Sequence, residues 1–181
     1  LGFKEGAFVA AGADAWGYLG QADLWAHGTL RVEQPLMREL VAGIPPDALA
    51  PLAYRALPDR MEVVPAVGPG LSLIMALFQI VGGRDAAFYV LPLSAGVAII
   101  AAYLIALRIA GRWSGLAAAG LLTASPSFLF QLTSSPMSDI PAAAWWGLSL
   151  ASALRESRRA ALGAGLAAGA AVLTRPNLAP L

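Results

Sequence analysis

Two isolated aspartates are the side chains of this sequence best placed to do chemistry. Asp14 lies in the run Gly-Ala-Asp-Ala-Trp-Gly-Tyr, which ends at Tyr18, and Asp139 lies in Ser-Pro-Met-Ser-Asp-Ile-Pro. A carboxylate beside or within apolar sequence of membrane length is costly to keep, so each aspartate is a functional candidate by default. Within hydrogen-bond reach of a substrate, such a carboxylate can act as a general base.

The composition predicts an integral membrane protein. Of the 181 residues, 58% are hydrophobic and only 13% are charged, whereas about a quarter of the residues in a soluble domain are charged. The formal net charge of +1 gives no reason to expect nucleic acid as a partner, because nucleic-acid binding usually needs a concentrated basic patch. The absence of cysteine excludes a disulfide framework, a thiol nucleophile and a cysteine-ligated metal.

Common catalytic motifs are also missing from the sequence. It contains no phosphate-binding loop, no His-Glu-x-x-His zinc motif and no Gly-x-Ser-x-Gly serine-hydrolase motif. Nucleotide binding, zinc proteolysis and serine hydrolysis therefore have no support. The reactive groups that remain are carboxylates, arginines, tyrosines and one histidine.

The chain divides into three regions by charge. Residues 1–62 hold most of the charge and are expected to form an aqueous or interfacial loop. Residues 63–83 contain no charge, but prolines and glycines crowd their first third. We therefore expect only a short juxtamembrane or re-entrant helix there, from Leu71 to Val81. Residues 84–181 are expected to hold transmembrane helices, at about 86–107, 113–133, 137–154 and 160–176.

The predicted fold is all-α: a polytopic membrane helix bundle whose exoplasmic first loop contains juxtamembrane helices. The turns between the predicted spans carry a group of arginines, which the positive-inside rule places in the cytoplasm: Arg108, Arg112, Arg155, Arg158 and Arg159. Asp139 then lies outside. Asp14 lies on the same outer face if residues 63–83 stay out of the bilayer, which their proline-rich start favours, and on the opposite face if they cross it.

Four motifs, taken in order, resemble those of the GT-C membrane glycosyltransferases. Residues 14–28 are similar to the first exoplasmic loop of that superfamily, in which an Asp is followed shortly by a Tyr and then by a small-residue helix ending in Gly. Residues 65–70 resemble the Pro-Gly stretch that opens a juxtamembrane helix. The pair Ser125-Pro126, followed by residues 137–141, resembles the second-loop pattern Ser-Pro … Ser-Asp-x-Pro, and residues 174–177 resemble the Arg-Pro ending of a later span. The most similar branches are the protein mannosyltransferase and aminoarabinose transferase types.

This resemblance implies an enzyme that moves a hexosyl or pentosyl group from a polyprenyl-phosphate-linked donor to a lipid, glycan or protein acceptor. It implies inversion of configuration, with Asp14 as general base and Asp139 in a supporting role, such as contact with the acceptor or a metal. It allows a divalent metal and implies no other cofactor. Side chains that could bind the substrates, with the cations neutralising the lipid phosphate, are Tyr18, Arg55, Arg60 and Arg175.

The implied location is the plasma membrane of the bacterial cell envelope, with the active site on the periplasmic or extracellular face. The sequence begins without a Met or a signal peptide, so we expect it to be an internal part of a longer protein.

Spacing alone also allows structural roles for these residues. Asp14 is a plausible N-cap of a helix over residues 15–27 that stops at Gly28, and Tyr18, one turn later, would share its face as an interfacial anchor. Asp139 is a plausible cap for a helix that begins at Ile140. Arg175 could simply extend its guanidinium to the membrane surface.

Two other functions remain open at the level of sequence. In a membrane transporter, both aspartates would bind a coupling ion or the substrate. Transporters usually keep such groups near the membrane midplane and often contain internal repeats, and neither feature is evident here. In a non-catalytic membrane scaffold, both aspartates would be dispensable.

Overall fold

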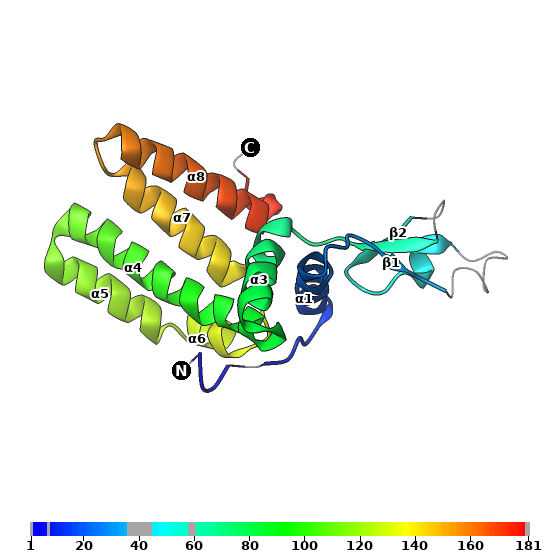
Figure 1. Ribbon diagram of the computed structural model, residues 1–181. Coiled ribbons are helices and arrows are strands. Elements are labelled where there is room, and N and C mark those ends of the chain that lie inside the picture. Colours follow the sequence, from blue (N-terminus) through cyan, green and yellow to red (C-terminus); the bar gives the residue numbers. More distant parts are fainter. Residues whose placement is uncertain (1, 7, 36–44, 58–60, 180–181) are drawn as a thin grey trace.

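Residues 2–6, 8–35, 45–57 and 61–179 are described by the computed structural model. Figure 1 shows a helical body at one side and a small sheet at the other. Between them two helices lie across the end of the body: α1 (Ala13–Ala26) and α3 (Pro69–Gly82). Most of the described chain is helical, as the sequence predicts.

The helical body consists of two antiparallel hairpins joined by a short helix. The first hairpin is α4 (Val90–Ala110) and α5 (Arg112–Ala124), and the second is α7 (Asp139–Ala153) and α8 (Arg158–Thr174). α6 (Pro126–Thr133) connects them. α4 packs against both α5 and α7, and the four long helices lie side by side (Figure 1).

Small residues let these helices approach closely. A methyl group added at Gly147 of α7 would lie 2.8 Å from the Cβ of Ala101 on α4, and one added at Gly115 of α5 would lie 2.9 Å from Tyr103. The buried residues of α4 are largely alanines. Since lipid provides no hydrophobic force between helices, such small-residue contacts are how membrane helices gain packing energy.

The helix lengths only partly match the predicted spans. Arg84–Ala110, which combines a 3₁₀ turn over Arg84–Tyr89 with α4, is long and apolar enough to cross a membrane. The predicted span 113–133 is instead two helices, α5 and α6, bent by 56°. The break lies at Ser125, because the residue before a proline avoids the helical conformation and Ser125 is extended. α7 and α8, with 15 and 17 residues, are shorter than the roughly 20 residues of a full span.

The all-α prediction does not hold between residues 32 and 65. Three short strands form an antiparallel sheet in the order β1-β3-β2: β1 (Val32–Glu33), β2 (Tyr54–Leu57) and β3 (Glu62–Pro65). Val63 in the central strand pairs with Val32 and Ala56. Strands of two to four residues are too short to display an alternating pattern in sequence, which is why they were missed. A 3₁₀ turn over Pro46–Leu49 precedes β2.

The helix predicted at Leu71–Val81 is present as α3 and is slightly longer. It starts at Pro69, a residue suited to the first helical turn, and ends before Gly83, whose φ is +80°. Its inner face packs on α1. Its outer face is apolar and exposed, formed by Leu73, Leu77, Ile80 and Val81. A helix with such an outer face is typical of one that lies at a membrane interface.

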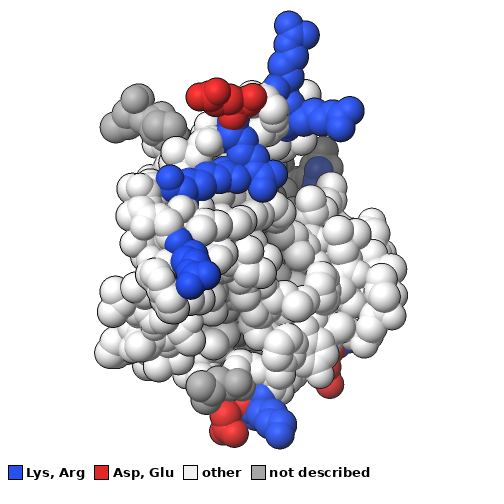
Figure 2. Space-filling view, turned by 90° about the vertical axis from the view of Figure 1, so that its left-hand side faces the viewer, with Lys and Arg blue, Asp and Glu red and all other residues white. Residues whose placement is uncertain are grey.

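The arginine-bearing turns lie at one end of the helical body, and the start of α7 lies at the other. Figure 2 looks onto the first end and shows basic side chains gathered over part of an otherwise largely uncharged surface. The last turns of α4 and α7 are linked directly, because the guanidinium of Arg108 donates a hydrogen bond to the carbonyl of Ala151. Asp139, the first residue of α7, is therefore separated from the arginine turns by the length of the helix.

Gly70 holds the start of α3 against the end of α8. A Cβ at this position would lie 2.5 Å from the backbone nitrogen of Thr174 and 2.7 Å from the carbonyl carbon of Leu173. We expect Gly70→Ala to lower the free energy of unfolding by about 1–3 kcal/mol, since the backbone of α8 must move to admit the methyl group. Thermal unfolding in detergent would measure the loss.

Gly165→Ala is the matched control, because a Cβ there meets no atom within 4 Å. Its helix-interior position predicts unchanged or higher stability. Equal stability of the two variants would contradict the close approach of α3 and α8.

Candidate functional site

The segment before α7 is joined to the N-terminal part of the chain by two side-chain hydrogen bonds. The hydroxyl of Tyr18, on α1, donates to Oγ of Ser138 over 3.0 Å, across 120 residues of sequence. The hydroxyl of Ser135 donates to the carbonyl of Ala11 over 2.7 Å. Tyr18 and Ser138 are buried. The helix that carries Asp14 is thus fixed directly beside the residue that precedes Asp139.

Asp14 lies in the first turn of α1, one turn before Tyr18, and its side chain is exposed. The helix begins at Ala13, and Gly12, with φ of +87°, is its N-cap. The predicted capping role of Asp14 is therefore wrong, because the helix starts two residues too early for this carboxylate to cap it. Among the described residues Asp14 has no hydrogen-bond or ion-pair partner. Its exposed carboxylate is available to meet a substrate.

Asp139 forms an ion pair with Arg175, the residue that directly follows α8. The capping role considered for Asp139 is also wrong: α7 starts at Asp139 itself, with Ser138 as an N-cap that makes no side-chain capping bond. The side chains of the pair are 33% and 32% exposed, so both reach the surface. A guanidinium has five N–H donors, and Arg175 therefore keeps donors for a further anion.

Asp139 also lines an open hollow of about 520 Å³ beside α6. The other residues of its lining mix amide, hydroxyl and apolar side chains: Pro126, Ser127, Phe130, Gln131, Ser134 and Met137. The hollow begins where the bend between α5 and α6 turns the chain. A substrate group that entered it would meet the carboxylate of Asp139.

The structure does not bring Arg55, another predicted substrate-binding residue, to either aspartate. Arg55 lies in β2 with an exposed side chain, in the sheet beyond α1 (Figure 1). No interaction joins it to Asp14 or Asp139 within the described residues. Arg60 lies outside the described residues. In the described part of the chain, no group of three or more His, Asp or Glu side chains could hold a metal ion. His27 follows the last residue of α1, and its Nδ1 donates to the carbonyl of Asp23.

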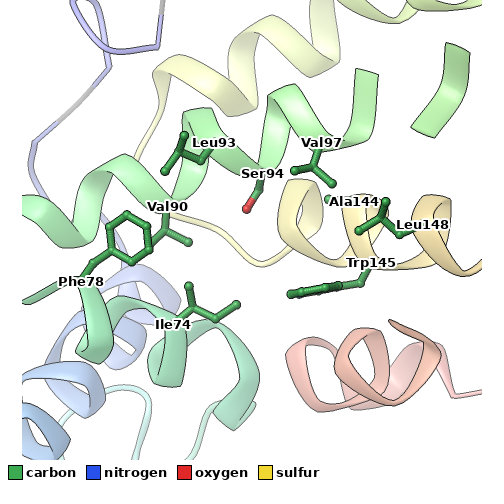
Figure 3. A pocket seen from close by; sticks show the side chains of 9 residues that line it. All are labelled: Ile74, Phe78, Val90, Leu93, Ser94, Val97, Ala144, Trp145 and Leu148. Atoms are coloured by element: carbon green, nitrogen blue, oxygen red, sulfur yellow. The ribbon is translucent and has the colours of Figure 1, made fainter. Parts of the chain in front are cut away.

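A mainly apolar pocket of about 170 Å³ lies among α3, α4 and α7. Figure 3 shows Ile74 and Phe78 from α3, residues of α4, and Trp145 of α7 lining it, with the hydroxyl of Ser94 as the one polar side chain labelled. Sequence reasoning missed this pocket because its walls come from three separate helices. It missed Ser138 and Ser135 for the same reason, since their partners are more than 100 residues away.

The bond between Tyr18 and Ser138 predicts a measurable coupling. Tyr18→Phe and Ser138→Ala each remove one partner from a buried hydrogen bond, so we expect each to lower the free energy of unfolding by about 1 kcal/mol. Removing both partners leaves no unsatisfied group, so the double variant should lose less than the sum of the two. Thermal unfolding of the two single variants and the double variant tests this. Strictly additive losses would show that the two hydroxyls are not coupled.

Comparison with known proteins places the chain in a family. The family described as dolichyl-phosphate-mannose-protein mannosyltransferase matches residues 65–181, more than half of the sequence. This chain belongs to that family. No curated protein matches it, and no solved structure does either.

Family membership confirms the resemblance to the GT-C membrane glycosyltransferases. The chain is thus a membrane-integral glycosyltransferase of the GT-C type. The matched residues include Asp139, Arg175 and the whole helical body, but not Asp14 or Tyr18. The roles of these individual residues stay predictions.

Proposed function

We propose that this glycosyltransferase moves a sugar from a polyprenyl-phosphate donor to an acceptor on the exoplasmic face, with Asp14 as general base. The observation that carries the proposal is the hydrogen bond from Tyr18 to Ser138. It holds the helix of Asp14, an exposed aspartate with no partner among the described residues, against the segment that bears the Asp139–Arg175 ion pair. In such a transfer a carboxylate can act as base on the acceptor, and a guanidinium can bind the leaving phosphate.

In the proposed reaction, Asp14 accepts the proton of the acceptor hydroxyl or amine as that group attacks the anomeric carbon. The bond from the anomeric carbon to the phosphate oxygen breaks on the opposite face, and the configuration inverts. Arg175 donates hydrogen bonds to the phosphate as negative charge develops on it. Asp139 holds the guanidinium of Arg175 in place and lines the hollow beside α6, where the acceptor enters.

The lipid part of the donor has a suitable place near this site. The pocket of about 170 Å³ among α3, α4 and α7 is comparable to the cavity of about 150 Å³ that holds a benzene molecule. It therefore has room for about one isoprene unit. The apolar outer face of α3 continues this surface into the membrane. We propose that the prenyl chain next to the phosphate lies there.

The proposal requires both aspartates on the outer face of the membrane. α1 and the start of α7 are in contact, whereas the arginine turns lie at the far end of the helices (Figures 1 and 2). This arrangement supports a shared face, with α3 along the membrane surface rather than across it.

Labelling of introduced cysteines tests the topology, since this sequence has none of its own. We expect Ala11→Cys and Ser134→Cys to react with a membrane-impermeant maleimide added to intact cells. Glu156→Cys, in the turn between α7 and α8, should react only after permeabilisation. Labelling of Ala11→Cys and Ser134→Cys from opposite faces would contradict the shared site.

A direct assay tests the reaction itself. Purified full-length protein in nanodiscs should release polyprenyl phosphate from a polyprenyl-phosphate-linked mannose or aminoarabinose donor, in proportion to sugar appearing on an acceptor. Failure of every such donor to react would overturn the proposal. Donor-independent uptake of a solute into vesicles would support the transporter instead, although both aspartates lie at helix starts rather than within helices.

A further inference from the structure

A second polar cleft lies between the C-terminal ends of α1 and α3. It has a volume of about 470 Å³ and is lined by both helix ends and the turn after α3: Asp23, Ala26, His27, Gln79, Ile80, Gly83 and Arg84. Asp23 follows Asp14 by nine positions on the same helix, which corresponds to roughly 14 Å along the axis at about 1.5 Å per residue. The lining of the cleft shares no residue with the ion pair or with the hollow beside α6.

Gln79 is the residue that marks this cleft as a binding site. Its side chain is only 7% exposed, and its amide nitrogen is buried without a hydrogen-bond partner among the described residues. A buried donor left unpaired costs about 1–3 kcal/mol, and native proteins keep few of them. Gln79 lines the cleft. Its nitrogen has almost no exposed surface, so the amide must turn toward the cleft to reach an acceptor atom of a ligand there.

The other polar groups of the cleft supply both donors and acceptors. Asp23 is half-buried, and its carboxylate can accept hydrogen bonds. His27 donates from Nδ1 to the carbonyl of Asp23 over 2.7 Å, so Nε2 of the neutral ring is an acceptor. Arg84 is exposed, and its guanidinium can donate hydrogen bonds. No ion pair joins Asp23 to Arg84 in the described part of the chain, so both charges are available, and they balance.

Tyr54 of β2 lies near Asp23 and packs against α1. Burial raises the pKa of the Tyr54 phenol above its usual value, and the negative charge of Asp23 adds to the effect. The phenol therefore stays protonated at neutral pH. Its ring lies against Gly20, because a Cβ there would be 2.2 Å from the Tyr54 hydroxyl. The sheet thus packs against the part of α1 that bears Asp23.

We infer that this cleft binds a saccharide. A hydroxyl both donates and accepts, so a sugar can bond to the Gln79 amide and Arg84 as acceptor and to Asp23 and His27 as donor. The balanced charges favour a neutral ligand. Ala26 and Ile80 offer an apolar wall for the C–H face of a sugar ring. This inference deepens the proposed function by adding a sugar subsite apart from the transfer site, and it does not require Asp14 to be the base.

Binding to the full-length protein in nanodiscs tests the subsite without any turnover. Methyl α-mannoside, followed by saturation-transfer NMR, should bind with a dissociation constant in the millimolar range. Gln79→Leu should weaken binding about tenfold, which corresponds to about 1.4 kcal/mol. This variant should remain folded, because the substitution removes an unpaired buried polar group.

Two variants separate this subsite from the transfer site. Asp14→Asn and Gln131→Leu, the latter in the hollow beside Asp139, should bind methyl α-mannoside as the unmodified protein does. Failure of the unmodified protein to bind would overturn the inference, and so would equal binding by Gln79→Leu. Loss of binding in Asp14→Asn would also overturn it, by placing the sugar at the transfer site. Loss of turnover in Asp14→Asn with binding intact leaves the two proposals distinguishable.

The origin of the sugar is decided by competition in the Asp14→Asn protein. Displacement of methyl α-mannoside by a polyprenyl-phosphate-linked sugar would show that the subsite binds the sugar of the donor. Displacement by a free oligosaccharide alone would identify it as a subsite for the glycan of an acceptor. Displacement by neither would overturn the inference.

Discussion

Asp14→Asn should lower kcat for sugar transfer by about 10²–10⁴-fold, the range that a positioned general base contributes. Asparagine keeps the shape of the side chain but cannot take up the proton of the acceptor. The exposed side chain has no hydrogen-bond partner to lose among the described residues, so the fold should be preserved. Steady-state turnover with a polyprenyl-phosphate-linked sugar, together with thermal unfolding, measures both effects. Asp14→Glu should retain part of the activity.

Asp85→Asn is a matched control for this substitution. Asp85 is likewise an exposed aspartate in the first turn of a helix, the 3₁₀ turn before α4, but it lies outside the site. Turnover of Asp85→Asn should equal that of the unmodified protein. If Asp14→Asn is equally active, Asp14 is not the base, and the carboxylate role passes to Asp139 or to no residue of this chain.

The second large effect is expected at the ion pair of Asp139 and Arg175. Arg175→Gln should lower kcat/KM on the order of 100-fold, because it removes the charge proposed to neutralise the leaving phosphate. Arg175→Lys should recover only part of the activity, since an ammonium lacks the planar fork of donors. Turnover measured over a range of donor concentrations separates kcat from KM.

A double-mutant cycle decides whether the two side chains act together. If Asp139 acts by holding Arg175, Asp139→Asn should cost little in the Arg175→Gln background, with a coupling of about 1–2 kcal/mol. The partial exposure of both side chains keeps the expected loss of stability in each single variant small, near 1 kcal/mol. Additive losses of activity would mean that Asp139 contacts the acceptor independently of Arg175.

The helices of the body could be anticipated because their signal is local. The apolar segments at 86–107 and 160–176 reappear as Arg84–Ala110 and as α8, and the short helix at Leu71–Val81 reappears as α3. The length and hydropathy of a segment, and the prolines and glycines at its ends, are properties of consecutive residues. They can therefore be read from the sequence directly. The bend at Ser125 and the sheet at residues 32–65 were not anticipated. The bend depends on how one proline is accommodated, and the sheet on pairing between strands too short to show a pattern.

For the candidate site, too, the sequence predicted some features and left others to the tertiary structure. The sequence by itself singled out Asp14 and Asp139 as isolated aspartates, and through the family motifs it indicated a glycosyltransferase of the GT-C type, which the family match confirms. It named Tyr18, Arg55, Arg60 and Arg175 together as possible substrate contacts, without deciding among them. It left the capping alternatives for both aspartates open, because an aspartate near a helix start has the same local sequence whether it caps the helix or not. The tertiary structure decided between them: neither aspartate caps its helix.

Only the tertiary structure decided which residues meet. The contacts of Tyr18 with Ser138 and of Asp139 with Arg175 span 120 and 36 residues, and the cleft around Gln79 forms only when α1 packs on α3. Hydropathy and helix length are properties of neighbouring residues, whereas these contacts depend on how separate helices pack, which no local pattern records. Sequence therefore supplied the chemical groups and the membrane setting, and packing of the helix ends supplied their pairing.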